Sequence, residues 1–334
     1  MRIIDIRFKK AFCLAILMVF QPSALAEVEP GTVLWEYDHD ARVNSVFERN
    51  GVVYLSSGGI LGGWGVAAID AIEGGLVWLH THHLGAVKSV MEKNGTVFSG
   101  SYNGTVIAAK ADDGAFLWDH THHPTDGLHA VFVHDGVVYS GGIDNAVIAA
   151  DVSDGEFLWQ HDTAFNVYSV FARNEVVYYG TTNFASTTAV NALNASDGEF
   201  LWGHDHHNAR ANSVFERDGV IYSGSNDNRV VAANADDGSF LWEHTHHDAR
   251  VYSVFQRNGV VYSGCSNGTV IAADGETGSL LWQHEHHSLE VNSVFESNGV
   301  IYSGSTDGLI IAAASGSGPP VPDRIFQSRF ESGD

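Results

Sequence analysis

The chain has 334 residues, with 17 basic and 40 acidic side chains and a net charge of −23 when its 19 histidines are neutral. A field of that sign repels nucleic acid and anionic lipid, so we expect neither as a partner. Only Cys13 and Cys265 occur, and disulfides therefore do not hold this fold.

Residues 1–26 have the pattern of a cleaved signal peptide. Four Lys or Arg side chains precede the apolar run 11–20, and the small residues at 23–26 suit a signal peptidase. An apolar run of about ten residues is too short to span a bilayer, and no longer run follows it. We therefore predict an exported protein, periplasmic or extracellular, without membrane insertion.

A tryptophan recurs along the chain at intervals of 40 to 43 residues. Each is followed by three apolar blocks, exemplified by Val-Asn-Ser-Val-Phe at 43–47, Val-Val-Tyr-Ser-Gly at 137–141 and Val-Ile-Ala-Ala at 106–109. Such short blocks rich in Val, Ile, Tyr and Phe indicate strands, and the Asn-Gly and Asp-Gly pairs between them favour tight hairpin turns. The seven tryptophans are Trp35, Trp78, Trp118, Trp159, Trp202, Trp242 and Trp282.

A unit of four strands and about 40 residues buries too little apolar surface to fold alone, so the units must pack on one another. Closing seven sheets into a ring also protects the sheet edges that an open stack exposes. The sequence thus predicts an all-β, seven-bladed β-propeller of four-stranded antiparallel blades over residues 27–315. Residues 316–334, which begin with Gly-Ser-Gly-Pro-Pro, are predicted to be a linker and a C-terminal tail.

The tryptophans belong to a longer motif, Ala-x-Asp-x-x-x-Gly-x-x-x-Trp, which is complete at 149–159 and 272–282. On this motif the chain resembles the quinoprotein-like propellers, built from PQQ-like repeats, in which it docks one blade on the next. The resemblance implies that the motif's glycines are structural; they are Gly31, Gly74, Gly114, Gly155, Gly198, Gly238 and Gly278.

The seventh copy of the motif is split between the two ends of the chain. Gly31 and Trp35 lack the alanine, whereas Ala312 ends a strand with no tryptophan after it. We therefore expect the segment around Trp35 to supply the outer strand of the last blade, closing the ring with an N-terminal strand.

Five histidine triplets follow the tryptophans, with the spacing His-x-His-His. They comprise His80, His82, His83, His120, His122, His123, His204, His206, His207, His244, His246, His247, His284, His286 and His287. All occupy the connection from one outer strand to the next inner strand, so we expect them on one face of the disc. In an extended segment residues i and i+2 point the same way, a spacing that would let His80 and His82 chelate Zn²⁺, Cu²⁺ or Ni²⁺.

Two structural readings compete with metal binding. The first histidine of each triplet recurs in six repeats, including His161, as expected for a hydrogen-bonding fixture like the His-Ser-Trp network of WD-repeat propellers. The adjacent His-His pairs are absent from two repeats, at 38–40 and 163–165, and could be solvated turn residues copied by duplication.

For function, the resemblance includes the seven-bladed propeller of the outer-membrane protein assembly machinery, which implies a monomeric protein-binding or scaffold module whose partner is another protein. The alternative is a metal-binding or pH-responsive protein. A quinoprotein oxidoreductase is less favoured, because no vicinal cysteine pair accompanies the motif and PQQ is therefore not expected. No catalytic residue stands out, and the irregular segments around Trp64 and around Asn183 and Phe184 are the candidates for recognition.

Overall fold

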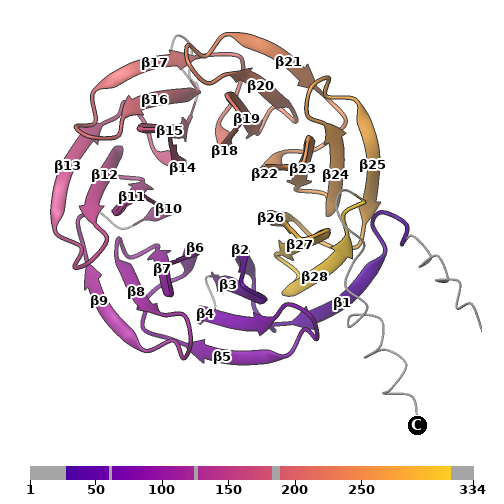
Figure 1. Cartoon of the computed structure of the whole chain (residues 1–334), viewed down its shortest axis with the longest axis horizontal. Helices are drawn as coiled ribbons and strands as arrows, with labels where there is room; N and C mark the ends of the chain where they lie inside the picture. Colours follow the sequence, from indigo (N-terminus) through magenta and orange to yellow (C-terminus); the bar gives the residue numbers. More distant parts are fainter. Residues whose placement is uncertain (1–27, 60–61, 124–126, 183–188, 317–334) are drawn as a thin grey trace, which may run out of the picture.

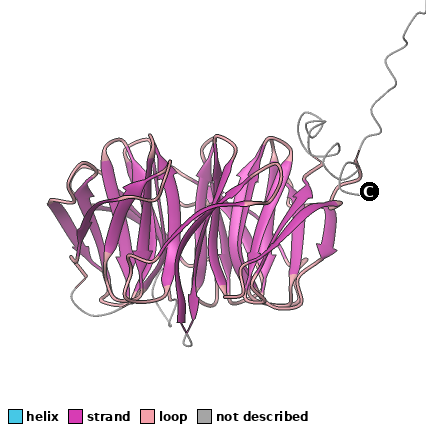
Figure 2. Cartoon of the chain, turned by 90° about the horizontal axis from the view of Figure 1, so that it is seen from below, coloured by secondary structure: helices cyan, strands magenta, loops and turns pink. Residues whose placement is uncertain are grey.

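The computed structural model describes residues 28–59, 62–123, 127–182 and 189–316, apart from the side chains of residues 59 and 62–64. These residues form 28 strands and no helix. The strands make seven four-stranded antiparallel sheets arranged as a ring around an open axis (Figure 1). Seen from the side, the ring is a flat disc whose strands cross its thickness (Figure 2). The predicted seven-bladed β-propeller is confirmed.

In six of the seven blades the strands run from the axis outward in chain order. The inner strands are β2 (Val43–Arg49), β6 (Val87–Lys93), β10 (Leu128–His134), β14 (Val167–Arg173), β18 (Ala211–Arg217), β22 (Val251–Arg257) and β26 (Val291–Ser297). The second strands are β3 (Val52–Gly59), β7 (Thr96–Ser101), β11 (Val137–Gly142), β15 (Val176–Thr181), β19 (Val220–Ser225), β23 (Val260–Cys265) and β27 (Val300–Ser305). We number the blades 1 to 7 from β2 to β26.

The two remaining strands of each blade complete it toward the rim. The third strands are β4 (Gly62–Asp70), β8 (Val106–Lys110), β12 (Ala146–Asp151), β16 (Val190–Asn194), β20 (Val230–Asn234), β24 (Thr269–Asp274) and β28 (Leu309–Ala314). The outer strands are β5 (Leu76–His80), β9 (Phe116–His120), β13 (Phe157–Asp162), β17 (Phe200–His204), β21 (Phe240–His244), β25 (Leu280–Glu285) and β1 (Val33–Asp38).

The N-terminal strand closes the ring, as the split motif predicts. Strand β1 pairs antiparallel with β28, with Trp35 opposite Ala312, and blade 7 has the order β1-β28-β27-β26. Leu34 and Trp35 are both buried. The last sheet is therefore held by pairing between residues almost 280 positions apart, taken from the two ends of the described chain.

The core lies between neighbouring blades. Third strands are apolar on both faces: Val66, Ala67, Ala68 and Ile69 are fully buried. Continuous burial explains why these blocks run apolar instead of alternating, and the alanines leave room for the next sheet. Each buried Val or Ile contributes about 1.5–3 kcal/mol relative to exposure in water.

Tryptophan docking joins the blades near the rim. The indole Nε1 of Trp35 donates to the carbonyl of Ala71 in blade 1 at 2.9 Å, and the ring lies over Gly74. That glycine has φ of 71°, and a Cβ there would lie 3.0 Å from the indole, so the turn requires glycine. In blade 6, Trp282 likewise donates to Ser315 at 3.1 Å.

The predicted signal peptide, the tail after Gly316 and residues 183–184 lie outside the described residues. Within the described ranges no helix has the length and apolar character needed to cross a bilayer.

Candidate functional site: blade connections and central channel

The five histidine triplets lie where predicted, in the connections that lead from an outer strand to the next inner strand. They do not form an open face. In the first triplet His80 and His83 are 7% and 4% exposed, and only His82 is exposed to solvent. The third histidine is buried in all five copies. Each position in the triplet has its own set of contacts.

The first histidine is a flat ring in an aromatic stack. His80 lies parallel to Trp78, with ring centroids 5.5 Å apart, and to His82 at 4.5 Å. Neither ring nitrogen of His80 has a hydrogen-bond partner within the described part of the chain. Burial lowers the pKa of His80 to about 4, with the neighbouring His82 contributing, so the ring is neutral at pH 7. In blade 7 Tyr37 occupies this position.

The second histidine bonds to the docking glycine of the next blade. His82 Nε2 donates to the carbonyl oxygen of Gly114 at 3.1 Å, and the corresponding distance from His122 to Gly155 is 2.9 Å. His286 donates to Gly31 at 2.8 Å and so ties the N-terminal segment to blade 6. The other two copies make the same bond, from His206 to Gly238 and from His246 to Gly278.

The third histidine bonds to a serine on the second strand of the next blade. In blade 3, Nε2 of His123 lies 2.8 Å from Ser140 Oγ and Nδ1 lies 2.8 Å from Asp144. Because an ionised carboxylate only accepts, Nδ1 carries the proton and Nε2 accepts from the serine hydroxyl. The order Asp-His-Ser is that of a catalytic triad. Ser140 is only 1% exposed, however, so its hydroxyl is not accessible to a substrate. The three hydrogen-bonded side chains instead join one blade to the next.

The His-Ser bond appears in five interfaces, with Nε2–Oγ distances of 2.7–2.8 Å. The two connections that lack the histidine, before blades 1 and 4, are followed by blades in which Leu55 and Tyr179 replace the serine. Histidine and serine are thus gained and lost together. The sequence contains this pairing, because the two repeats without the His-His pair also lack the serine of the Tyr-Ser-Gly block.

The fixture predicted for the first histidine therefore belongs to the third, a correction that follows from the side-chain contacts. An aspartate four residues after the serine also recurs, as Asp144, Asp227 and Asp307. Where asparagine replaces it, at Asn103 and Asn267, Nδ1 of His83 and of His247 has no partner in the described structure. Burial lowers the pKa of these two histidines to about 3 and about 4.

Metal binding by the triplets stays a prediction. Among the described residues no group of three or more His, Cys, Asp or Glu side chains is arranged to hold a metal ion. Chelation by His80 and His82 would require the stacked rings to turn and the bond to Gly114 to break. Dialysis against Zn²⁺, Cu²⁺ or Ni²⁺ tests it, and less than about one bound ion per chain would contradict it.

The central channel was not identified from the sequence. One phenylalanine from each of six inner strands lines it, and Met91 takes the seventh place. Neighbouring rings lie 4.5–4.8 Å apart, as for Phe255 and Phe295. The six are Phe47, Phe132, Phe171, Phe215, Phe255 and Phe295. They give the channel an apolar belt between its two mouths.

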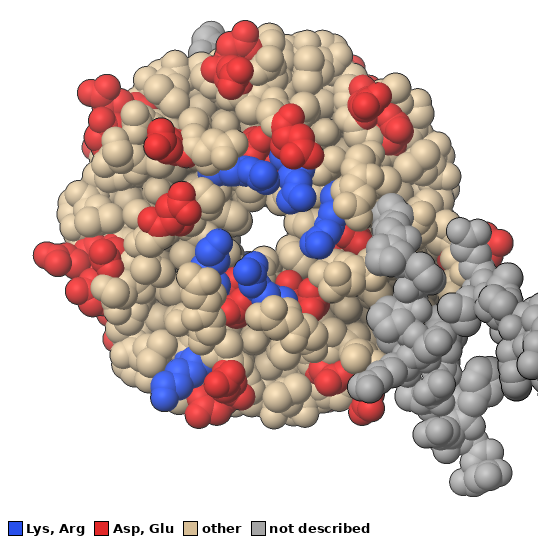
Figure 3. All heavy atoms as spheres, viewed as in Figure 1, with Lys and Arg blue, Asp and Glu red and all other residues tan. Residues whose placement is uncertain are grey.

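At one mouth, where the inner strands end in hairpin turns, five strands contribute a cation at the same position. These residues, which we call the hairpin mouth, are Arg49, Lys93, Arg173, Arg217 and Arg257. Figure 3 shows Lys and Arg gathered around the central opening on one face, with most Asp and Glu toward the rim. The mouth and belt together form a cavity of about 560 Å³.

Three of these arginines pair with a buried glutamate on the next blade, such as Arg49 with Glu92 at 3.2 Å. The glutamates also cap hairpins: Glu216 accepts from Gly219 N at 2.9 Å. Lys93 and Arg217 depart from this arrangement, because the next blade has Val133 or Gln256 in place of the glutamate.

The opposite mouth is lined by the second residue of every inner strand together with two preceding arginines. We call these residues the connection mouth: Arg42, Asn44, Lys88, His129, Tyr168, Arg210, Asn212, Tyr252 and Asn292. Asparagine is the repeated residue, and blades 2, 3, 4 and 6 replace it with lysine, histidine or tyrosine. The mouth encloses about 240 Å³.

Seven blades of repeats joined by tryptophan docking define the class of this protein, a PQQ-like β-propeller. The chain belongs to the family whose model is described as outer membrane protein assembly factor BamB, which matches residues 62–189 and 186–318.

Solved structures of other propellers share the fold. The WD40 β-propeller domain of Doa1 is 18% identical, with a TM-score of 0.73 over 85% of this chain and 96% of that one. A computationally designed protein, Ika8, is 19% identical, with a TM-score of 0.67 over 86% of this chain and 99% of that one. A comparison with curated proteins found no match.

Proposed function

We propose that this protein is an exported binding module of the cell envelope or exterior, and that it binds an acidic segment of a partner protein at the hairpin mouth. Membership of a family whose model is described by an outer-membrane assembly factor supports the envelope setting.

The main support for the proposal is the position of the Lys and Arg side chains, which gather at the two mouths of the channel. Eleven Lys and Arg lie in the described residues, and eight line the two channel mouths. Elsewhere most of the charged side chains are Asp and Glu, as the rim of the face in Figure 3 shows. Placing like charges together costs free energy, and an anionic partner offsets that cost.

The hairpin mouth presents its cations outward and keeps their counter-charges inside. The side chains of Arg49 and Arg257 are 45% and 35% exposed, whereas Glu92 and Glu296 are 3% and 0% exposed. A docking segment would therefore meet guanidinium groups first, with the phenylalanine belt beneath them. We expect it to carry acidic residues on either side of an apolar side chain that enters the belt.

A fluorescent peptide, Glu-Glu-Glu-Phe-Glu-Glu-Glu, tests this by anisotropy at low salt. Lys93→Gln should weaken binding about two- to fivefold, and Lys93→Gln with Arg217→Gln about five- to twentyfold, since an exposed pair contributes roughly 0.2–1 kcal/mol. Lys110→Gln, the same change at the exposed end of strand β8, is the matched control and should leave affinity within about 1.5-fold. Equal loss in Lys93→Gln and Lys110→Gln, or no binding by the wild type, would contradict the proposal.

A further inference from the structure

Four inner strands carry a buried glutamate next to their last residue, at the hairpin mouth. Each glutamate caps its own hairpin by accepting a hydrogen bond from the backbone N–H three residues further on. In Glu92, Glu216 and Glu296 the carboxylate also pairs with an arginine of the preceding blade. Glu48 is the exception. Among the described residues it forms no ion pair, although it is only 6% exposed.

The exception arises from a serine in the preceding blade. The last residue of the inner strand supplies the arginine at the other three junctions, and in blade 7 that residue is Ser297. Strands β26 and β2 are neighbours, with the rings of Phe295 and Phe47 4.8 Å apart. Ser297 therefore takes the repeat position from which an arginine would face Glu48, and it carries no charge.

The negative charge of Glu48 acts on its neighbours in blade 7. Burial raises the pKa of both Glu296 and Tyr302, and the charge of Glu48 adds to this rise in each of them. The described residues thus leave the carboxylate of Glu48 without a counter-charge. Because a buried carboxylate without a counter-charge is costly, a cation from outside would be bound favourably.

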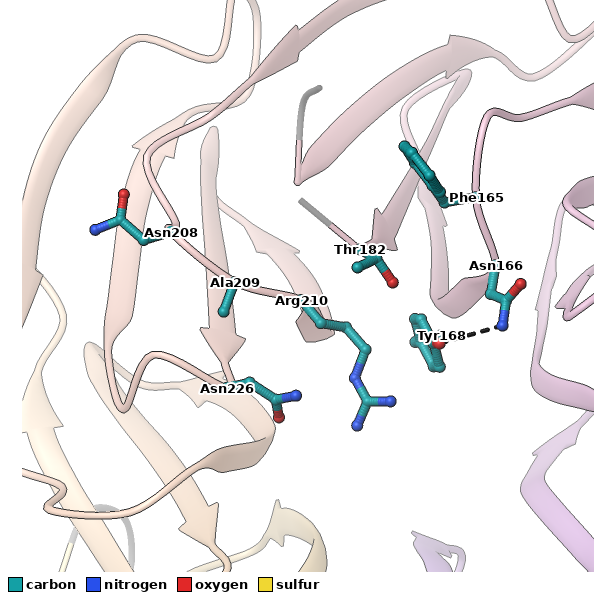
Figure 4. Close-up of a pocket in the computed structure, with 8 residues that line it drawn as sticks. All are labelled: Phe165, Asn166, Tyr168, Thr182, Asn208, Ala209, Arg210 and Asn226. Atoms are coloured by element: carbon teal, nitrogen blue, oxygen red, sulfur yellow. Dashed lines mark hydrogen bonds between the residues drawn. The ribbon is translucent and has the colours of Figure 1, made fainter. Parts of the chain in front are cut away.

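The charged side chains of the connection mouth are in a different situation, because each already has a partner. Arg210 lies over the Tyr168 ring at 4.2 Å, and Figure 4 shows the two side chains next to each other. Lys88 lies 5.7 Å from the centre of the Tyr102 ring, and Arg42 pairs with a glutamate at 3.6 Å. The junction of blades 7 and 1 is therefore the better candidate for a charged group of a ligand.

A side chain of a protein partner suits this junction better than a metal ion. Glu48 lines the cavity of the hairpin mouth, so a segment bound there can reach it. Within the described ranges no three His, Cys, Asp or Glu side chains are arranged to hold a metal ion, and a divalent cation needs several such ligands. A guanidinium needs only one carboxylate, as the pair of Arg49 and Glu92 shows.

The junction lies between the two cations of the hairpin mouth whose next blade lacks the glutamate. These are Lys93 in blade 2 and Arg217 in blade 5, and the ring passes from blade 5 through blades 6, 7 and 1 to blade 2 (Figure 1). A segment that spans the mouth with an acidic residue at each of these cations would have its middle, not its ends, available to the junction.

We propose that the segment bound at the hairpin mouth carries an arginine or a lysine next to its apolar residue, and that this cation pairs with Glu48. The inference rests on the proposed function and adds a feature of the partner to it. Acidic residues at the two ends meet Lys93 and Arg217, and the apolar side chain enters the phenylalanine belt. A carboxylate at the central position would instead be repelled by Glu48.

Two fluorescent peptides that differ in one residue, Glu-Glu-Glu-Phe-Arg-Glu-Glu and Glu-Glu-Glu-Phe-Gln-Glu-Glu, test this by anisotropy. A second pair, with the arginine or glutamine before the phenylalanine, covers the opposite chain direction. In at least one pair, the Kd of the glutamine peptide divided by that of the arginine peptide should fall about fivefold or more in Glu48→Gln. Glutamine keeps an oxygen that can accept from Gly51, so the hairpin cap is retained.

Two other variants show whether the effect belongs to this junction. Ser297→Arg supplies the cation from the protein itself and should lower the same ratio about fivefold or more. Glu216→Gln is the matched control, because Glu216 has the same repeat position but already pairs with Arg173, and the ratio should stay within about 1.5-fold. An unchanged ratio in Glu48→Gln, or an equal fall in Glu216→Gln, would overturn the proposal.

The wholly acidic peptide Glu-Glu-Glu-Phe-Glu-Glu-Glu separates this proposal from the one on which it rests. If that peptide binds and neither pair of peptides responds to Glu48→Gln, only the cation at Glu48 is wrong. If none of the peptides binds the wild type, both proposals are wrong.

Discussion

The histidine connections near the rim and the mouths of the channel are both rich in polar side chains. They differ in how far the same residues recur from one repeat to the next. Five connections carry the same triplet with the same bonds, His82 to Gly114 and His83 to Ser99 in the first copy. In the connection mouth the repeated asparagine gives way to Lys88, His129 and Tyr168. The rim is uniform and the mouth is not.

This difference helps to distinguish side chains that stabilise the fold from side chains that are candidates for binding. A contact that joins two blades is copied together with its partner, and the joint loss of histidine and serine at blades 1 and 4 shows that the two are also lost together. In the connection mouth, by contrast, neighbouring blades present unlike side chains, and the hairpin mouth repeats a cation that faces solvent instead of a bond between blades. We therefore infer that the hydrogen-bonded histidines stabilise the ring, and we propose that the cations of the channel bind ligands.

The largest predicted effect comes from opening the ring, on which both regions depend. Deleting residues 28–38 removes β1, exposes the edge of β28 and takes away the docking of Trp35. A buried tryptophan alone contributes about 3–5 kcal/mol, so the thermal midpoint should fall by roughly 10 °C or more. Circular dichroism melts measure it, and an unchanged midpoint would contradict closure by β1.

The next effect tests whether a third histidine holds two blades. Ser223→Ala removes the hydroxyl that lies 2.8 Å from Nε2 of His207 and should cost about 1–3 kcal/mol. A double-mutant cycle with His207→Ala should give a coupling energy of at least about 1 kcal/mol by urea unfolding. Ser56→Ala is the control, since Ser56 is buried but its hydroxyl has no partner in the described structure. If the decreases in the free energy of unfolding caused by His207→Ala and Ser223→Ala are additive in the double variant, the two side chains are not coupled and the proposed bond between blades is wrong.

Acid should weaken the rim through its buried histidines. The pKa of His80 is about 4 in the fold and 6.5 ordinarily, so between these values the unfolded chain binds a proton that the folded chain does not. Stability therefore falls as pH drops through that window. His80→Phe keeps an aromatic ring against Trp78 but cannot bind a proton. The decrease in the free energy of unfolding between pH 7 and pH 4 should therefore be smaller in this variant by about 1–3 kcal/mol. Unchanged acid sensitivity in this variant would contradict the role of that ring.

The smallest predicted effect is on stability at the hairpin mouth. Lys93 makes no ion pair among the described residues, so Lys93→Gln should change the free energy of unfolding by less than about 0.5 kcal/mol. The same substitution should weaken binding of the acidic peptide. Parallel urea titrations and anisotropy measure the two quantities. A decrease of more than about 1 kcal/mol in the free energy of unfolding would show that Lys93 stabilises the fold, as the histidines of the rim do, and would contradict the difference between the two regions.

The repeat made the architecture predictable. Trp35 without its alanine and Ala312 without its tryptophan were enough to place β1 beside β28. The roles within the triplet were not predictable from spacing, because alternation places His80 and His82 on one side without showing that the rings stack. The channel was not predicted because its lining comes one residue per blade, so Lys88 and Arg210 line one mouth only once the ring has closed.

Hydrogen exchange with and without the acidic peptide tests the central claim most directly, since it reports both regions in one experiment. The account predicts slower exchange in the hairpin turns that follow Arg49, Lys93 and Arg217, and no change in the connections that carry His82, His122 and His206. Protection of the histidine connections with unchanged exchange at the hairpin turns would contradict it.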